Sequence, residues 1–110
     1  MQEKITIEKL NKYFEITGLA IKKAEESDNK AVIDEKERVR NDFLDMIKRY
    51  YSDAKYFFER GDFVNAFAAL NYAHGWLDAG ARIKLFNVKD SRLFTVDDEE
   101  GKNKKDLKKL

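Results

Sequence analysis

The sequence predicts an all-α protein: a three-helix up-down bundle with a long second helix and a polar C-terminal tail. Three observations predict this class. The chain of 110 residues contains no proline, so no residue of that type interrupts a helix. Apolar residues recur at intervals of three and four along three segments. Two short breaks, at residues 27–29 and 61–62, separate these segments.

The first helix is expected from about Ile7 to Glu26, with Thr6 as its N-cap. Gly18 weakens this helix by about 1 kcal/mol relative to alanine unless close packing uses the missing side chain. One stripe of the helix should face the core, and it contains Leu10, Phe14, Thr17, Ile21 and Ala24.

The second helix is expected from about Lys30 to Arg60, with Lys36 as the one residue out of pattern. Its outer face carries acid-before-base pairs such as Asp45 with Arg49, which indicate a solvated surface. Its apolar positions follow a seven-residue rhythm, and they are Val32, Val39, Phe43, Met46, Tyr50, Ala54 and Phe57.

A helical hairpin should follow, because Gly61 can end the second helix and Asp62 can cap a third helix that starts at Phe63. The periodic pattern ends after Phe86. One apolar face of the third helix contains Phe63, Ala66, Phe67, Leu70, Ala73, Leu77 and Ala81. The opposite face contains Ala69, Tyr72, Trp76, Gly80 and Ile83. We expect this helix to be central, packed against two neighbours or against one neighbour and a partner molecule.

A narrow polar strip remains on the third helix, centred on Asn71, Asp78 and Arg82 and continued by Ala68 and Gly75. His74, which is the single histidine, lies beside Asn71 and Asp78 at helical spacing. A general base or a metal site would use such an arrangement, but one histidine with one carboxylate cannot form a structural zinc site. We interpret His74 as a residue at the edge of the core whose ring forms a local hydrogen bond.

Other catalytic signatures are missing from the sequence, which has no cysteine, glycine-rich phosphate loop or nucleophile elbow. We therefore expect no enzyme, no cofactor, no catalytic residue and no metal ligand. Most aromatic residues should pack in the core, whereas Tyr51 and Tyr56 lie off the apolar stripe and are candidates for an exposed patch. The candidate interaction strip consists of Asn71, His74, Asp78, Arg82, Tyr51 and Tyr56.

Beyond the third helix, residues 93–96 form a short apolar patch that either covers the end of the bundle or forms a brief extended segment. We divide the chain into a helical domain at 1–96 and a charged, flexible tail at 97–110. The whole chain has a net charge of +1 and residues 101–110 carry +4, so residues 1–100 carry −3 and are mildly acidic. Candidate phosphate contacts are therefore confined to Lys102, Lys104, Lys105, Lys108 and Lys109.

The absence of cysteine fits a reducing compartment, and the sequence shows neither a signal peptide nor an apolar run long enough to span a bilayer. We expect a cytoplasmic protein with no membrane contact.

The hairpin resembles a known family in the run Asp53–Ala54 through Gly61–Asp62 to YAHGWLDA at residues 72–79. It is similar to the small archaeal family catalogued as domain of unknown function 357, with weaker similarity over residues 5–96. This resemblance implies a three-helix bundle from an archaeal cytoplasm and no activity. The hairpin also looks loosely like helical nucleotide-binding or nuclease domains of prokaryotic defence systems. Their arginine four to six residues before the histidine is missing, because Arg60 is the nearest arginine before His74.

Two hypotheses for function follow. The first is a non-catalytic module that binds a protein partner or a second copy of itself, because the third helix is apolar on two faces. The alternative is a factor associated with RNA or nucleoprotein through the lysine-rich tail.

Overall fold

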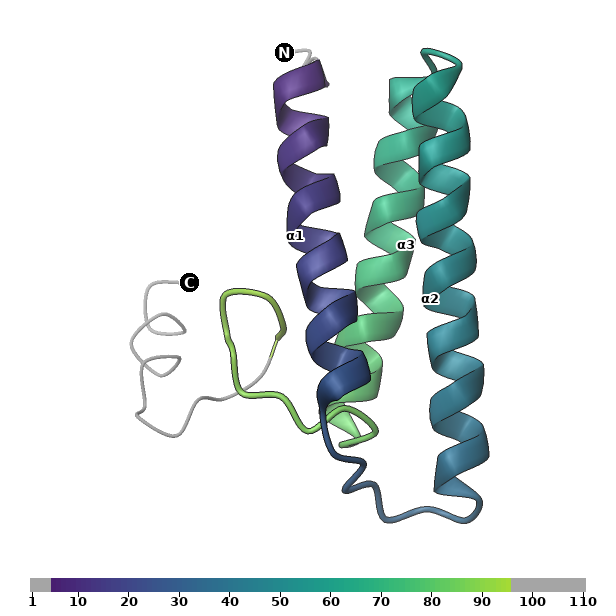
Figure 1. Cartoon of the computed structure of the whole chain (residues 1–110), viewed down its shortest axis with the longest axis vertical. Helices are drawn as coiled ribbons and strands as arrows, with labels where there is room; N and C mark the ends of the chain where they lie inside the picture. Colours follow the sequence, from purple (N-terminus) through teal and green to yellow (C-terminus); the bar gives the residue numbers. More distant parts are fainter. Residues whose placement is uncertain (1–4, 96–110) are drawn as a thin grey trace.

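Three α-helices form a bundle in the computed structural model, which describes residues 5–95. The helices are α1 (Ile7–Glu26), α2 (Lys36–Glu59) and α3 (Phe63–Arg82). They run alternately down, up and down the bundle, and α2 is the longest with 24 residues. No described residue belongs to a strand. The predicted all-α, up-down architecture is therefore confirmed (Figure 1).

The central element is α3, which packs against both other helices, whereas α1 and α2 touch each other far less (Figure 1). Its two apolar faces account for this position. On one face Phe67 meets Tyr13 of α1 with ring centroids 5.0 Å apart. On the other face Trp76 meets Phe43 of α2 at 4.9 Å. The expectation that α3 packs against two neighbours is confirmed.

Helix α1 has the predicted bounds because the predicted cap forms. The side-chain oxygen of Thr6 accepts a hydrogen bond from the backbone N–H of Lys9 at 3.0 Å. Gly18 is used for close packing: a Cβ at this position would lie 3.0 Å from the hydroxyl of Tyr51. The predicted stripe faces the core, and its members Leu10, Thr17, Ile21 and Ala24 are buried, together with Ala20.

Helix α2 starts six residues later than predicted, at Lys36. Asn29 holds the preceding segment in a loop: its amide group donates to the backbone carbonyl of Lys36 and accepts from the N–H of Ala31. Glu35 has a φ of 54°, in the left-handed region, which prevents a helix from continuing through it. Val32, predicted on the core stripe, is consequently 97% exposed, and that assignment was wrong.

The hairpin forms as predicted. Gly61 has a φ of 77°, a conformation that favours glycine, and it follows the end of α2. The carboxylate of Asp62 accepts a hydrogen bond from the N–H of Asn65 at 3.2 Å and caps α3.

Helix α3 ends at Arg82, four residues before the end of the apolar pattern. Lys84 adopts a left-handed φ of 71°, and the carbonyl of Gly80 accepts hydrogen bonds from the N–H groups of Leu85 and Phe86. This turn directs both side chains into the core, where each is fully buried. The apolar pattern continues past the end of the helix because Leu85 and Phe86 are buried in the core, although the turn and not the helix directs them there.

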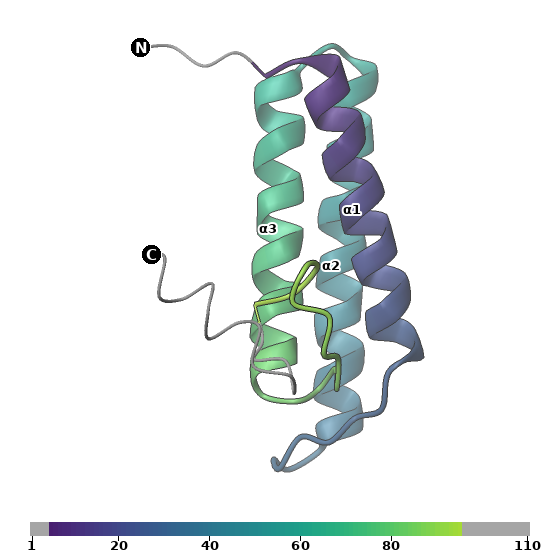
Figure 2. The same ribbon diagram turned by 90° about the vertical axis from the view of Figure 1, so that its left-hand side faces the viewer.

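The segment after α3 folds back over the lower parts of α1 and α3 (Figure 2). Phe94 is buried at 3% exposure, and residues 91–95 form turns rather than an extended strand. Of the two expectations for the apolar patch, covering the end of the bundle is confirmed for its described residues. Residues 97–110, the predicted tail, lie outside the described part of the chain.

Within residues 5–95, none of the helices is both long and apolar enough to cross a lipid bilayer.

Candidate functional site

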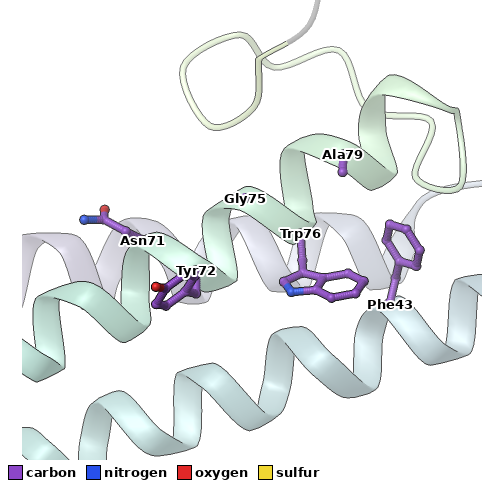
Figure 3. Close-up of a pocket in the computed structure, with 6 residues that line it drawn as sticks. All are labelled: Phe43, Asn71, Tyr72, Gly75, Trp76 and Ala79. Atoms are coloured by element: carbon purple, nitrogen blue, oxygen red, sulfur yellow. The ribbon is translucent and has the colours of Figure 1, made fainter.

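An open apolar groove runs between α2 and α3 on the side of the bundle away from α1 (Figure 3). In this view Tyr72 and Trp76 project from α3 toward α2, Phe43 projects from α2 toward them, and α1 lies behind. We call this surface the groove face, and its lining residues are Phe43, Asn71, Tyr72, Gly75, Trp76 and Ala79.

Aromatic pairs fix the shape of the groove face. The rings of Phe43 and Trp76 pack edge to face with an interplanar angle of 85°. The ring of Tyr72 stacks on Tyr50 of α2, with centroids 5.3 Å apart. Such pairs are worth about 0.5–1.5 kcal/mol beyond the area that they bury. The groove is therefore a preformed surface, because its walls are held by contacts within one chain.

The groove face leaves large apolar side chains in solvent. Tyr72 is 62% exposed, and the same side of α3 continues to Val64, at 69%, and Ile83, at 43%. Single exposed apolar residues are common, but a row of them along one helix marks an interaction site in a small protein. Contact with another apolar surface would remove this area from water.

A second, polar hollow lies on the other side of α3, toward α1. It brings together Asn71, His74 and Asp78 of α3, Tyr13 of α1 and residues 91–95. The carboxylate of Asp78 accepts hydrogen bonds from the backbone N–H of Thr95 at 2.9 Å and from its hydroxyl at 3.1 Å. Both carboxylate oxygens are thereby used to hold the covering segment. The hollow is thus a fixed structural joint between α3 and this segment.

His74 lies in this polar hollow and is half-buried. Burial lowers the pKa of its imidazole, and the negative charge of Asp78 opposes part of that effect. Among residues 5–95 its ring has no hydrogen-bond partner, contrary to the local hydrogen bond that we expected. Burial of the ring therefore favours the neutral form of the imidazole.

The single histidine should make stability depend on pH below neutrality. Because the pKa of His74 is lower in the folded protein than its ordinary value of about 6.5, the unfolded chain binds the proton more readily. The stabilising contribution is complete above about pH 6.5 and is lost as the pH falls toward the folded-state pKa. We expect urea unfolding at pH 7.5 and 5 to show lower stability at pH 5, and His74→Gln to reduce that difference. An unchanged difference in this variant would contradict the assignment.

The remaining members of the candidate interaction strip are scattered. Arg82 is exposed near the end of α3, and Tyr56 is 52% exposed on α2, beneath the guanidinium of Arg60. Tyr51 differs from expectation: it is half-buried, and its hydroxyl donates to the carbonyl of Phe14 on α1 at 3.3 Å. Its ring therefore joins two helices of the core and does not form an exposed patch.

Other site predictions concern residues that the structure does not describe or groups that it does not bring together. The candidate phosphate contacts, Lys102, Lys104, Lys105, Lys108 and Lys109, lie outside the described residues. In the described range, no three His, Asp or Glu side chains are close enough to share a metal ion.

Sequence reasoning missed the groove itself and one structural arginine. Tyr72 and Trp76 were assigned to helix packing, which is correct for one side of each ring but leaves the outer side open. The signal that identifies the groove was the small size of Gly75 within the strip that was interpreted as polar, together with Ala79 one helical turn later. Arg40 was missed because its partners, the carbonyls of Glu25 and Leu85, are distant in sequence.

Comparison with protein families gives one match, to the model described as "Protein of unknown function (DUF357)", over residues 12–86. The chain belongs to the DUF357 family. The matched region covers α1 from residue 12 onward and all of α2 and α3, so every residue of the groove face lies within it. The segment that covers the polar hollow, residues 91–95, lies beyond the match. Searches of curated proteins and of solved structures gave no match.

Proposed function

We propose that this protein is a non-catalytic interaction module that binds another protein surface through the groove face. The observation that carries the proposal is the row of exposed apolar residues along α3 and its C-terminal cap, which includes Val64, Tyr72 and Ile83. The groove lies between two helices whose aromatic pairs are already in place, so binding needs little reorganisation.

A non-catalytic role is supported by the way the polar residues are used. The carboxylate of Asp78 is occupied by Thr95, and burial favours the neutral form of His74. The groove face is mostly apolar: its lining side chains carry no charge, and their polar groups are the Asn71 amide, the Tyr72 hydroxyl and the Trp76 indole N–H. These features favour recognition of an apolar surface over proton transfer. We place the protein in the cytoplasm of an archaeal cell, in agreement with the absence of cysteine from the sequence.

Site-specific photo-cross-linking tests the proposal. A photoreactive phenylalanine analogue replaces Tyr72 or Val64, and a matched control carries it at Glu15, an exposed position of α1 away from the groove. After irradiation in lysate of the source organism, we expect one discrete adduct from the two groove positions and none from the control. Excess wild-type protein should compete for the adduct, whereas Ala79→Glu should not.

Two outcomes would overturn the proposal: equal adduct yields at Glu15 and at the groove positions, or no adduct at the groove positions. The mass of a specific adduct also tells whether the captured protein is a second copy of this chain or a different protein. Photo-cross-linking therefore separates the general proposal from the more specific inference below.

A further inference from the structure

We propose that the groove face binds a second copy of this chain, with the two α3 helices antiparallel about a twofold axis. This inference rests on the proposed function and names the partner. The axis crosses at the level of the peptide that joins Ala73 to His74, at the middle of α3, and lies on the groove side of the helix. Helices α2 and α3 of each copy then form a four-helix core, with α1 of each copy outside, because α1 packs on the opposite side of the groove (Figure 3).

The first argument is self-complementarity of the exposed face. In an antiparallel pair centred on that peptide, Val64 of one copy faces Ile83 of the other. Ala68 faces Ala79, and Tyr72 faces Gly75. A twofold interface requires each contact to occur twice with the roles exchanged, so a self-complementary pattern must be symmetric about one point of the helix. All three pairs are symmetric about the same point.

The second argument is shape. A Cβ added to Gly75 would meet no atom within 4 Å, so the surface outside this glycine is open. Beside it, Tyr72 is 62% exposed and its ring is held by Tyr50. In the antiparallel register the projecting ring of one copy lies over the hollow at Gly75 of the other. Large residues opposite small ones allow two helices to approach closely and fill the space between them.

The third argument is charge, and it selects the orientation. At the N-terminal end of α3, Glu59 and Asp62 outnumber the one base, Arg60, whereas Arg82 and Lys84 lie at the C-terminal end. Antiparallel pairing brings the acidic end of each α3 to the basic end of the other and also pairs opposite ends of the helix dipoles. Parallel pairing would bring like charges together at both ends. Exposed ion pairs add little affinity, but they discriminate between orientations.

The available area reaches the lower end of the range for specific interfaces. Twenty residues of α3 extend about 30 Å, and two packed helices present a face about 20 Å wide. The resulting footprint, on the order of 600 Å² for each copy, approaches the roughly 800 Å² per partner of a standard interface. Phe43 and Tyr50 extend the apolar area onto α2.

Charge complementation tests both the face and the register. Ala68→Glu and Ala79→Lys each place one charge in the proposed interface, opposite an alanine. Each variant alone should dimerise at least about 30-fold more weakly than wild type, because the charge is buried without a partner. An equimolar mixture of the two should associate again, since position 68 of one chain then faces position 79 of the other with opposite charge. Glu15→Lys, on α1, is the matched control and should leave the dimer unchanged.

Sedimentation equilibrium of the full-length purified chain, of 12.9 kDa, provides the readout, and circular dichroism checks that each variant retains its helices. We expect a wild-type dimer, two monomeric variants and a dimeric mixture. A wild-type protein that remains monomeric at several hundred micromolar overturns the inference. So do two variants that remain dimeric, or a mixture that stays monomeric. A monomeric wild type that still gives a groove-specific adduct with a different protein overturns this inference and leaves the proposed function standing.

Discussion

Gly80→Ala is expected to destabilise the protein, because the added methyl group has no space. A Cβ at this position would lie 2.3 Å from a ring carbon of Phe86, which is fully buried. Overpacking of this kind typically costs about 1–3 kcal/mol, and the better helix propensity of alanine offsets at most about 1 kcal/mol of that cost. The measurement is the free energy of unfolding in urea, recorded at a protein concentration below that of any association.

Gly75→Ala is the matched control, five residues earlier in the same helix. A Cβ there meets nothing within 4 Å, so only the gain in helix propensity remains. This variant should be more stable than wild type by about 0.5–1 kcal/mol. The two variants should therefore change the free energy of unfolding in opposite directions, which separates steric crowding from helix propensity. Equal effects of the two substitutions would show that Phe86 moves aside without cost.

Arg40→Met is expected to destabilise the protein by about 2 kcal/mol. The guanidinium of Arg40 donates to the carbonyls of Leu85, Ala24 and Glu25 at 2.8, 3.3 and 2.9 Å, and so joins three segments of the chain. Hydrogen bonds from a charged donor contribute about 1.5–3 kcal/mol, and partial exposure to water reduces their sum. Methionine keeps an apolar stem of similar length and removes the donors. Unfolding in urea again provides the measurement.

Arg38→Met controls for the loss of a positive charge from α2. Arg38 pairs with Glu35 and Asp42, but all three side chains are more than half exposed. Exposed pairs contribute about 0–1 kcal/mol, so this variant should differ little from wild type. Equal losses of stability in the two variants would show that Arg40 acts through its charge alone and not through the three carbonyls.

The fold was largely predictable because most of its signals are local. The bounds of α1 follow from Thr6 and from an apolar stripe with helical spacing. The hairpin follows from Gly61 and Asp62, which end one helix and cap the next. The start of α2 was not predictable from the stripe, because the hydrogen bonds of Asn29 hold Val32 in a loop despite its apolar character.

The candidate site was less predictable than the fold. Periodicity placed Tyr72 and Trp76 on the second apolar face of the helix, but it does not determine how much of each ring a neighbouring helix covers. That depends on where α2 lies, and Tyr72 remains 62% exposed. Tyr51 differs in the opposite direction. It lies off the stripe and was expected to be exposed, but its hydroxyl donates to the carbonyl of Phe14 on α1.

The sequence by itself determined that three helices form, where most of them begin and end, and that the third is apolar on two sides. Helical periodicity and capping join residues three or four positions apart, so a single stretch of chain contains the information. Only the tertiary structure decided that Arg40 binds Leu85, 45 positions away, and that one side of α3 stays uncovered. Such features depend on how separate helices approach each other, and local patterns leave that approach undetermined because the same apolar stripes allow several packings.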